Sequence, residues 1–393
     1  MYSEVTDIGV VQARRTDAAD RERISAVAAQ PIGPRRSEPD MFEEQARLRP
    51  NAVAIKAQSS QITYGELNRW ANRVGRAIIE RIGSDQEPVA VTLGNDIGHM
   101  AVMLGVMKSN NIVLALNPDD PPDRAAQILG IAGAKLFIAN EAWLANADDF
   151  APDGVEIMRF ENLGADLPDT NLGLDIDPES YARLIFTSGS TGAPKGVPKE
   201  HWKDGHGTLH PYSKFGPEDK VAQLAPPSFA AAPAFISYAL LGGGTLCLYD
   251  VRKEGLHRLA EWINDNQITV LGMVPSLFRR LLEMVPEGVT FPTVRLVTAG
   301  GEALLKGERH ILNRLVPIGQ HSHHRKKLID LLLRFLPTDL PLRVPEQQRQ
   351  PDVVKGAHIG KQLGDLECAR HPSMTDLMRL HAGNIFTLEL DRA

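Results

Sequence analysis

Cysteine is scarce in this chain, whose 393 residues include only two. Cys247 and Cys368 cannot make a disulfide framework, so we expect a reducing, cytoplasmic location. A basic excess is also lacking, because the formal net charge is -6, and that balance gives no reason to expect a nucleic-acid partner. The first residues are charged and include no apolar segment, so no signal peptide is evident in them.

Long apolar runs are missing apart from residues 229–249, which carry no charge over about the length of a membrane-spanning helix. Pro233 and the three glycines at 242–244 would break such a helix. We therefore expect a short helix, a glycine turn and a strand from Thr245 to Leu248, and no membrane as a partner. The hydrophobic fraction of 43% and the charged fraction of 23% are those of an ordinary globular protein.

Helical and strand patterns alternate along the middle of the chain, which is typical of parallel sheets with crossover helices. The expected helices are 64–82, 100–107, 122–131, 234–241, 255–263, 276–284 and 302–315. The expected strands are 88–93, 112–116, 135–139, 184–186, 245–248, 269–272 and 293–298, with a polar loop over about 148–180. The predicted fold class is α/β, with two βα-layered subdomains, mostly parallel sheets and an irregular or helical tail. The predicted domains are a flexible arm (1–40), a core (41–317) and an unrelated, poorly ordered tail (318–393).

Residues 185–197, Ile-Phe-Thr-Ser-Gly-Ser-Thr-Gly-Ala-Pro-Lys-Gly-Val, carry the most specific chemical signal. Glycines let a loop bring its backbone N–H groups to an anion, while hydroxyls and an ammonium add donors for phosphate oxygens. The spacing fails the common nucleoside-triphosphatase pattern, which needs four residues between its first glycine and Gly-Lys-Ser/Thr. A flexible linker is the alternative, against which the preceding strand and the rigid Pro-Lys argue. The polyphosphate-binding candidates are Thr187, Ser188, Gly189, Ser190, Thr191, Gly192 and Lys195.

This segment closely resembles the signature loop of the adenylate-forming enzymes, which comprise acyl- and aryl-CoA ligases, luciferases and adenylation domains of nonribosomal peptide synthetases. Residues 62–67 (Ile-Thr-Tyr-Gly-Glu-Leu) resemble the motif that opens the first helix of adenylation domains. Asn117-Pro118 lies where the family has a Pro-x-Asp-Pro element, and His201 is usual after the loop. Residues 296–302 (Leu-Val-Thr-Ala-Gly-Gly-Glu) resemble the glycine motif beside the acyl and adenine pocket. The resemblance covers about 41–315.

The resemblance implies a two-step reaction in which a small carboxylic acid attacks the α-phosphate of Mg-ATP and releases pyrophosphate. The acyl group then usually passes to the thiol of CoA or of a carrier protein's phosphopantetheine. ATP and Mg2+ are the implied cofactors, with the loop at 187–191 and Lys195 on the β- and γ-phosphates. Gly300, Gly301 and Glu302 would border the nucleotide, although a glycine turn that starts a helix is the alternative for them.

The resemblance also places a substrate pocket. The Asp with which amino-acid-activating relatives bind the substrate's α-ammonium falls at Ala230. An unpaired ammonium in an apolar pocket costs several kcal/mol of desolvation, so we expect a substrate that lacks an α-amino group or holds it elsewhere. The alternative is that the alignment of this segment with the family is inaccurate, so that Ala230 does not correspond to the Asp. The implied pocket residues, all small or apolar, are Phe229, Ala230, Ala231, Ala234, Gly272, Val297 and Ala299.

Other family motifs are missing from residues 303–393. We find no Tyr-Gly-x-Thr-Glu for adenine and Mg2+, no Tyr-x-Thr-Gly-Asp for the ribose, and no lid lysine. The resemblance therefore implies a C-terminally truncated, incomplete core, and we assign no catalytic residue and leave open whether the chain is an enzyme. We expect impaired activity; the alternative is a non-catalytic nucleotide-binding remnant or an interaction protein.

The residues past about 317 differ in character from the core. His321, His323 and His324 could bind a metal, but we assign no metal site because no carboxylate or Cys partner is evident. The amphipathic stretch at 328–336, next to basic residues, could instead dock a partner or an anionic surface. The interpretation that we favour is an unselected extension, from a shifted reading frame or a gene fusion.

Overall fold

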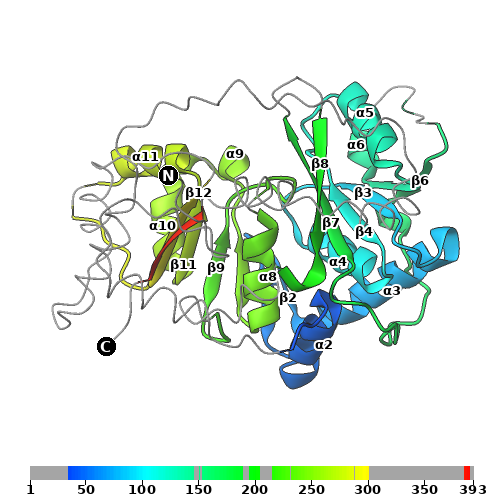
Figure 1. Cartoon of the computed structure of the whole chain (residues 1–393). Coiled ribbons are helices and arrows are strands. Elements are labelled where there is room, and N and C mark those ends of the chain that lie inside the picture. The colour runs from blue at the N-terminus through cyan, green and yellow to red at the C-terminus, as the bar shows by residue number, and fades with distance from the viewer. Residues whose placement is uncertain are drawn as a thin grey trace, which may run out of the picture. The chain divides into compact units, whose positions relative to one another are not determined.

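The computed structural model describes residues 34–145, 150, 153–188, 194–203, 215–230, 232–286, 288–300 and 385–389 (Figure 1). These residues form two compact units, a larger one up to Gly255 and a smaller one from Leu256 onward. Both alternate strands and helices, as the α/β prediction requires. No helix in the described ranges is apolar over enough of its length to cross a membrane.

The larger unit contains most of the secondary structure. Its elements are α2 (Glu38–Leu48), β1 (Val53–Lys56), β2 (Gln61–Thr63), α3 (Tyr64–Ile82), β3 (Pro88–Thr92), α4 (Ile97–Lys108), β4 (Ile112–Ala115), α5 (Pro122–Ala132), β5 (Leu136–Ala139), α6 (Glu141–Ala145), β6 (Glu156–Arg159), η1 (Phe160–Asn162), β7 (Tyr181–Ser188), β8 (Pro194–Glu200), β9 (Lys220–Gln223), α8 (Ala232–Gly242), β10 (Thr245–Leu248) and α9 (Val251–Glu254). Those of the smaller unit are η2 (Leu256–Arg258), α10 (Leu259–Asp265), β11 (Val270–Met273), α11 (Pro275–Met284), β12 (Leu296–Gly300) and β13 (Ile385–Glu389).

One six-stranded sheet of the larger unit has the order β6-β5-β3-β4-β7-β8. All neighbours are parallel except β7 and β8, which are antiparallel. Helices α5 and α6 cover one face and α3 and α4 the other (Figure 1). A sheet covered on both faces needs strands that are apolar throughout, and every residue of β3 is accordingly buried. The predicted mostly parallel sheet is therefore confirmed.

The remaining strands follow the same pattern. In the larger unit β9, β10 and β1 run parallel, and β2 returns antiparallel to β1. In the smaller unit β11 and β12 are parallel, and β13 pairs antiparallel with β12, with Thr298 opposite Thr387. The short helix, glycine turn and strand expected within 229–249 are confirmed as α8, the glycines after it and β10.

Helix α3 begins at the Ile-Thr-Tyr-Gly-Glu-Leu motif, and its start is fixed by a capping box. Thr63 Oγ1 accepts a hydrogen bond from the backbone N–H of Glu66 at 3.3 Å, and Glu66 Oε2 accepts one from the N–H of Thr63 at 2.9 Å. The buried Tyr64 hydroxyl donates to the carbonyl of Gly244 at 2.7 Å. In this chain the motif therefore fixes the start of the helix and ties it to the backbone at Gly244.

The structure differs from the expected elements in several places, and strands β1, β2, β8 and β9 were not expected at all. Strand β6 lies within the expected loop at 148–180; it is short, and its polar first and last residues leave only two apolar residues to indicate a strand at the sheet edge. The helix expected over 255–263 is instead the short η2 followed by α10, and a separate helix, α9, precedes it and ends at Gly255, whose φ is 81°. Helix α2 begins at Glu38 with Ser37 as its N-cap, so residues 38–40 are helical and do not continue the expected arm.

Candidate functional site

The predicted phosphate-binding segment includes the end of one strand and the start of the next, which pair as an antiparallel hairpin. Strand β7 runs up to Ser188 and strand β8 begins at Pro194, with Ser188 opposite Pro194 and Thr187 opposite Lys195. The strand expected at 184–186 is thus confirmed and is longer at both ends. Gly189, Ser190, Thr191 and Gly192 lie outside the described residues, and of Ser188 the structure describes only the backbone.

The hairpin places a hydroxyl and an ammonium on one face. Directly opposed residues of an antiparallel pair point to the same face, with Cβ atoms about 5 Å apart. Thr187 and Lys195 are such a pair, and Lys195 is exposed while Thr187 is half-buried. A point charge beside a hydroxyl, at the base of a glycine-rich turn, suits an anion with several oxygens.

Strand β4 is the parallel neighbour of β7, with Val113 opposite Arg183, so both strands end at the same edge of the sheet. Ligands of α/β sheets lie at such carboxyl edges. Asn117 follows β4 here, and its side chain shapes a turn: Nδ2 donates to Asp120 Oδ1 at 3.1 Å, and Oδ1 accepts from the N–H of Asp119 at 3.3 Å. The turn leads into α5, so Asn117 has a structural role in this chain.

The candidate pocket residues differ in exposure. Phe229 is 51% exposed, Ala230 is also exposed, and Ala234 on α8 is buried in the core. Ala231 lies outside the described residues. The larger unit therefore presents Phe229 and Ala230 to solvent at the start of α8.

The smaller unit carries the other candidates. Gly272 is in β11 and Val297 in β12, and both are buried; Gly272 lies opposite Thr298. Ala299 and Gly300 end β12, and only their backbone is described. Gly301, Glu302 and the helix expected over 302–315 lie outside the described residues. The strand before the glycine motif is confirmed, whereas the roles of these side chains stay predictions.

Burial changes the acid–base behaviour of two side chains near these elements. Burial raises the pKa of the Cys247 thiol to about 11, so this cysteine stays protonated and is no nucleophile. Burial lowers the pKa of the His99 imidazole, whose Nδ1 donates to the carbonyl of Leu93 at 3.1 Å. Within the part of the chain that the structure describes, no three His, Cys, Asp or Glu side chains are grouped for a metal ion. His321, His323 and His324 lie outside that part.

Sequence reasoning missed a buried charged side chain within the hairpin. Arg183 of β7 pairs with Glu38 of α2, and both are almost fully buried. A signal existed in the sequence, since Arg183 interrupts the apolar run at 182–186 of an expected core strand. Such a charge needs a buried partner, but nothing near it in sequence indicates which residue that is.

A sequence profile described as AMP-binding enzyme matches residues 42–320. Among curated relatives, a plipastatin synthase of Bacillus subtilis (strain 168) is 32% identical over 293 residues, which is 72% of this chain and 8% of the relative. The chain thus spans less than a tenth of the length of that synthase.

Solved structures share the fold. The nonribosomal peptide synthetase FmoA3 in its AMPPNP-bound form superposes with a TM-score of 0.68 at 22% identity, over 77% of this chain and 32% of that one. The N-terminal subdomain of Klebsiella oxytoca NpsA, in complex with 3-hydroxybenzoyl-AMSN, gives 0.61 at 24% identity, over 71% and 70%. The likeness covers the α/β arrangement described above.

Proposed function

The chain belongs to the AMP-binding enzyme family, and we propose that it activates a carboxylic acid with ATP to give an acyl-adenylate and pyrophosphate. The observation that carries this proposal is the β7–β8 hairpin, with Thr187 and Lys195 on one face below a turn of glycines and hydroxyls. The family uses ATP, and this arrangement fits its phosphates.

In this proposal the hairpin holds the β- and γ-phosphates, with the Lys195 ammonium and the Thr187 hydroxyl as donors. The carboxylate oxygen of the acid attacks the α-phosphorus, and pyrophosphate leaves from the side that the hairpin grips. Such a step depends on in-line positioning and on neutralising charge. Mg2+, when bound, supplies part of that neutralisation.

We further propose that the acid lacks an α-amino group. Ala230, at the position where the family resemblance puts an ammonium-binding Asp, carries no charge, and Phe229 beside it is apolar. FmoA3 has been solved with α-methyl-L-serine-AMP and NpsA with 3-hydroxybenzoyl-AMSN, so similar folds hold both kinds of acid. An uncharged pocket favours the second kind, because an unpaired ammonium there costs several kcal/mol.

Turnover by this chain alone is proposed to be slow. Residues 303–393 contain none of the family's motifs for Mg2+, the ribose or the lid lysine. Each such electrostatic contact contributes roughly 3 kcal/mol or more to the transition state. CoA or a carrier-protein phosphopantetheine is the proposed acceptor of the acyl group. The core over 41–317 is proposed as the nucleotide-binding domain, with 318–393 as an extension.

ATP–pyrophosphate exchange with a panel of carboxylic acids tests the activity. Exchange that depends on aryl or aliphatic acids and not on standard α-amino acids supports the proposal. Exchange with α-amino acids alone contradicts the proposed substrate class.

A second candidate, a nucleotide-binding protein without turnover, is favoured by the missing motifs. It predicts that AMPPNP raises the unfolding temperature while no acid supports exchange, because a ligand that binds only the folded state stabilises it. Absence of both effects would contradict nucleotide binding altogether.

A further inference from the structure

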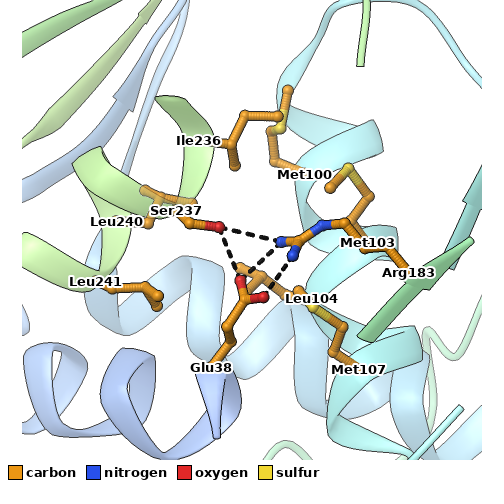
Figure 2. A pocket seen from close by; sticks show the side chains of 10 residues that line it. All are labelled: Glu38, Met100, Met103, Leu104, Met107, Arg183, Ile236, Ser237, Leu240 and Leu241. Carbon is orange, nitrogen blue, oxygen red and sulfur yellow. Dashed lines mark hydrogen bonds and ion pairs between the residues drawn. The ribbon is translucent and has the colours of Figure 1, made fainter. Parts of the chain in front are cut away.

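Three elements of the larger unit meet at a buried ion pair (Figure 2). Glu38 at the first turn of α2 and Arg183 of β7 have side-chain exposures of 2% and 3%. Arg183 Nη2 donates to Glu38 Oε2 at 2.7 Å, and Nη1 donates to Oε1, so the pair is bidentate. A bidentate fork fixes orientation as well as distance.

Ser237 of α8 completes the network. Its hydroxyl accepts from Arg183 Nη2 at 3.1 Å and donates to Glu38 Oε2 at 2.8 Å. Figure 2 shows the three polar side chains pointing toward one another from three different elements. The surrounding side chains are apolar: Met100, Met103, Leu104, Met107, Ile236, Leu240 and Leu241.

An ion pair in such a place is poorly explained by stability alone. Removing two charges from water is costly, and well-packed apolar residues of similar volume often replace a buried pair with no loss of stability. Apolar side chains can pack together in several relative positions of the elements that carry them. The bidentate ion pair and the Ser237 hydroxyl form their hydrogen bonds in only one relative position. The network therefore specifies how α2, β7 and α8 are aligned.

Two of the three aligned elements, β7 and α8, lead to the proposed site. Thr187 lies four residues after Arg183 on β7, so a shift of this strand moves the hairpin. Ala234 lies one helical turn before Ser237 on α8, and α8 begins two residues after Ala230. We propose that Glu38, Arg183 and Ser237 are positioning residues that hold α8 in register with β7, and so hold the acid pocket in place relative to the phosphate-binding hairpin. The second half of this inference rests on the proposed function; the first half does not.

The test uses a double substitution, Glu38→Leu with Arg183→Met, which replaces the charges by apolar groups of similar size. Urea unfolding measures stability, and native-state hydrogen exchange measures the opening of α8 and β7. We expect a urea midpoint near that of the wild type but exchange of the 232–242 amides about tenfold faster, because packing is kept while register is lost. Unchanged exchange at unchanged stability would overturn the inference.

The Lys108–Glu43 pair provides a matched control. Lys108 of α4 is also buried, at 1% side-chain exposure, and is bonded to Glu43 of α2, so this pair joins α2 to α4 and includes no residue of β7 or α8. Lys108→Met with Glu43→Leu is expected to leave exchange of α8 unchanged. Equal acceleration of α8 in both double variants would mean a general loss of packing and would also overturn the inference.

If the double variant fails to fold, Ser237→Ala tests the inference instead, because it keeps the ion pair and removes only the hydrogen bonds that join the pair to α8. The expected result is faster hydrogen exchange of the α8 amides with unchanged exchange of the α2 amides, and unchanged exchange of α8 would contradict the inference.

ATP titration of the same proteins distinguishes failure of this inference from failure of the proposed function. A wild type that does not bind ATP defeats the proposed function and leaves the exchange result standing. A wild type that binds ATP, beside a Ser237→Ala variant with weaker coupling between ATP and acid, supports both.

Discussion

At the scale of single residues, Lys195 carries the most direct prediction. Lys195→Met is expected to weaken ATP binding about tenfold or more, since a hydrogen bond from a charged group contributes roughly 1.5–3 kcal/mol and 1.4 kcal/mol is a factor of ten. Stability should change by less than about 0.5 kcal/mol, because the side chain is exposed. Isothermal titration with ATP measures the first quantity and thermal unfolding the second.

Lys199→Met is the matched control for that experiment. It removes a lysine from the same face of β8, but Lys199 lies opposite Arg183 and is about 13 Å along the strand from Lys195. ATP affinity that falls equally in both variants would show a general charge effect and would contradict a local role for Lys195.

His99 predicts a pH dependence of stability. Burial lowers the pKa of this imidazole, although the Asp96 carboxylate and two backbone carbonyls oppose the shift. The unfolded chain, with a histidine pKa of about 6.5, therefore binds the proton first. Stability is fully present above that pH and falls as the pH drops below it, by at most about 1.4 kcal/mol per pH unit.

Urea unfolding between pH 7.5 and 5.5 measures this slope. His99→Gln is expected to flatten it, whatever the substitution does to stability at pH 7.5. His257→Gln, at an exposed histidine, is the control for deleting an imidazole. An acid slope that His99→Gln leaves unchanged would assign the loss of stability to other groups.

What the sequence could indicate at this scale depends on whether the chemistry is local. The hydroxyls, glycines and lysine of the hairpin are contiguous, so their clustering is visible in the sequence. Glu38 and Arg183 are far apart along the chain and meet only in the folded structure, so neither could be assigned a partner from the sequence. Ala230 is a different case, since its proposed role comes from a resemblance and its exposure alone neither requires nor excludes that role.

At the scale of elements, the start of α3 carries a prediction. Thr63→Ala removes the side chain that accepts from Glu66 N–H and should lower the free energy of unfolding by about 1 kcal/mol. Glu66→Ala should also destabilise, and the double variant should lose less than the sum, because the two residues cap each other. Urea unfolding of the cycle measures the coupling. Ser60→Ala, in the exposed turn nearby, is the control, and strictly additive losses would argue against a reciprocal cap.

Elements with a clear apolar period could be predicted at nearly the correct bounds. In α3, Leu67, Ala71, Val74 and Ile78 recur at helical spacing and are all buried. Strand β6 and the break at Gly255 could not be predicted from the sequence, for different reasons. An edge strand needs no continuous apolar run, and a glycine ends a helix only when the following backbone turns away, which the composition of 255–263 does not reveal.

At the scale of the whole molecule, the order of several motifs identified the family, and the pairing of distant strands was beyond prediction. Strand β13 lies in the segment expected to be unrelated to the core, yet its five residues pair antiparallel with those of β12. The apolar residues Ile385, Phe386 and Leu388 are typical of a strand, but nothing near them in the sequence indicates which strand they pair with. Backbone pairing of this kind satisfies an edge that would otherwise expose its N–H and carbonyl groups.

Deleting residues 385–393 should therefore affect the smaller unit selectively. The β12 amides at 296–300 would lose the partner strand, and their hydrogen exchange is expected to rise about tenfold or more, while protection of β3 and β7 in the larger unit stays the same. Deleting only 390–393 keeps β13 and is the matched control. Unchanged protection of β12 in the longer deletion would show that β13 contributes nothing to this edge, whereas loss of protection in β3 as well would show that the last strand supports both units.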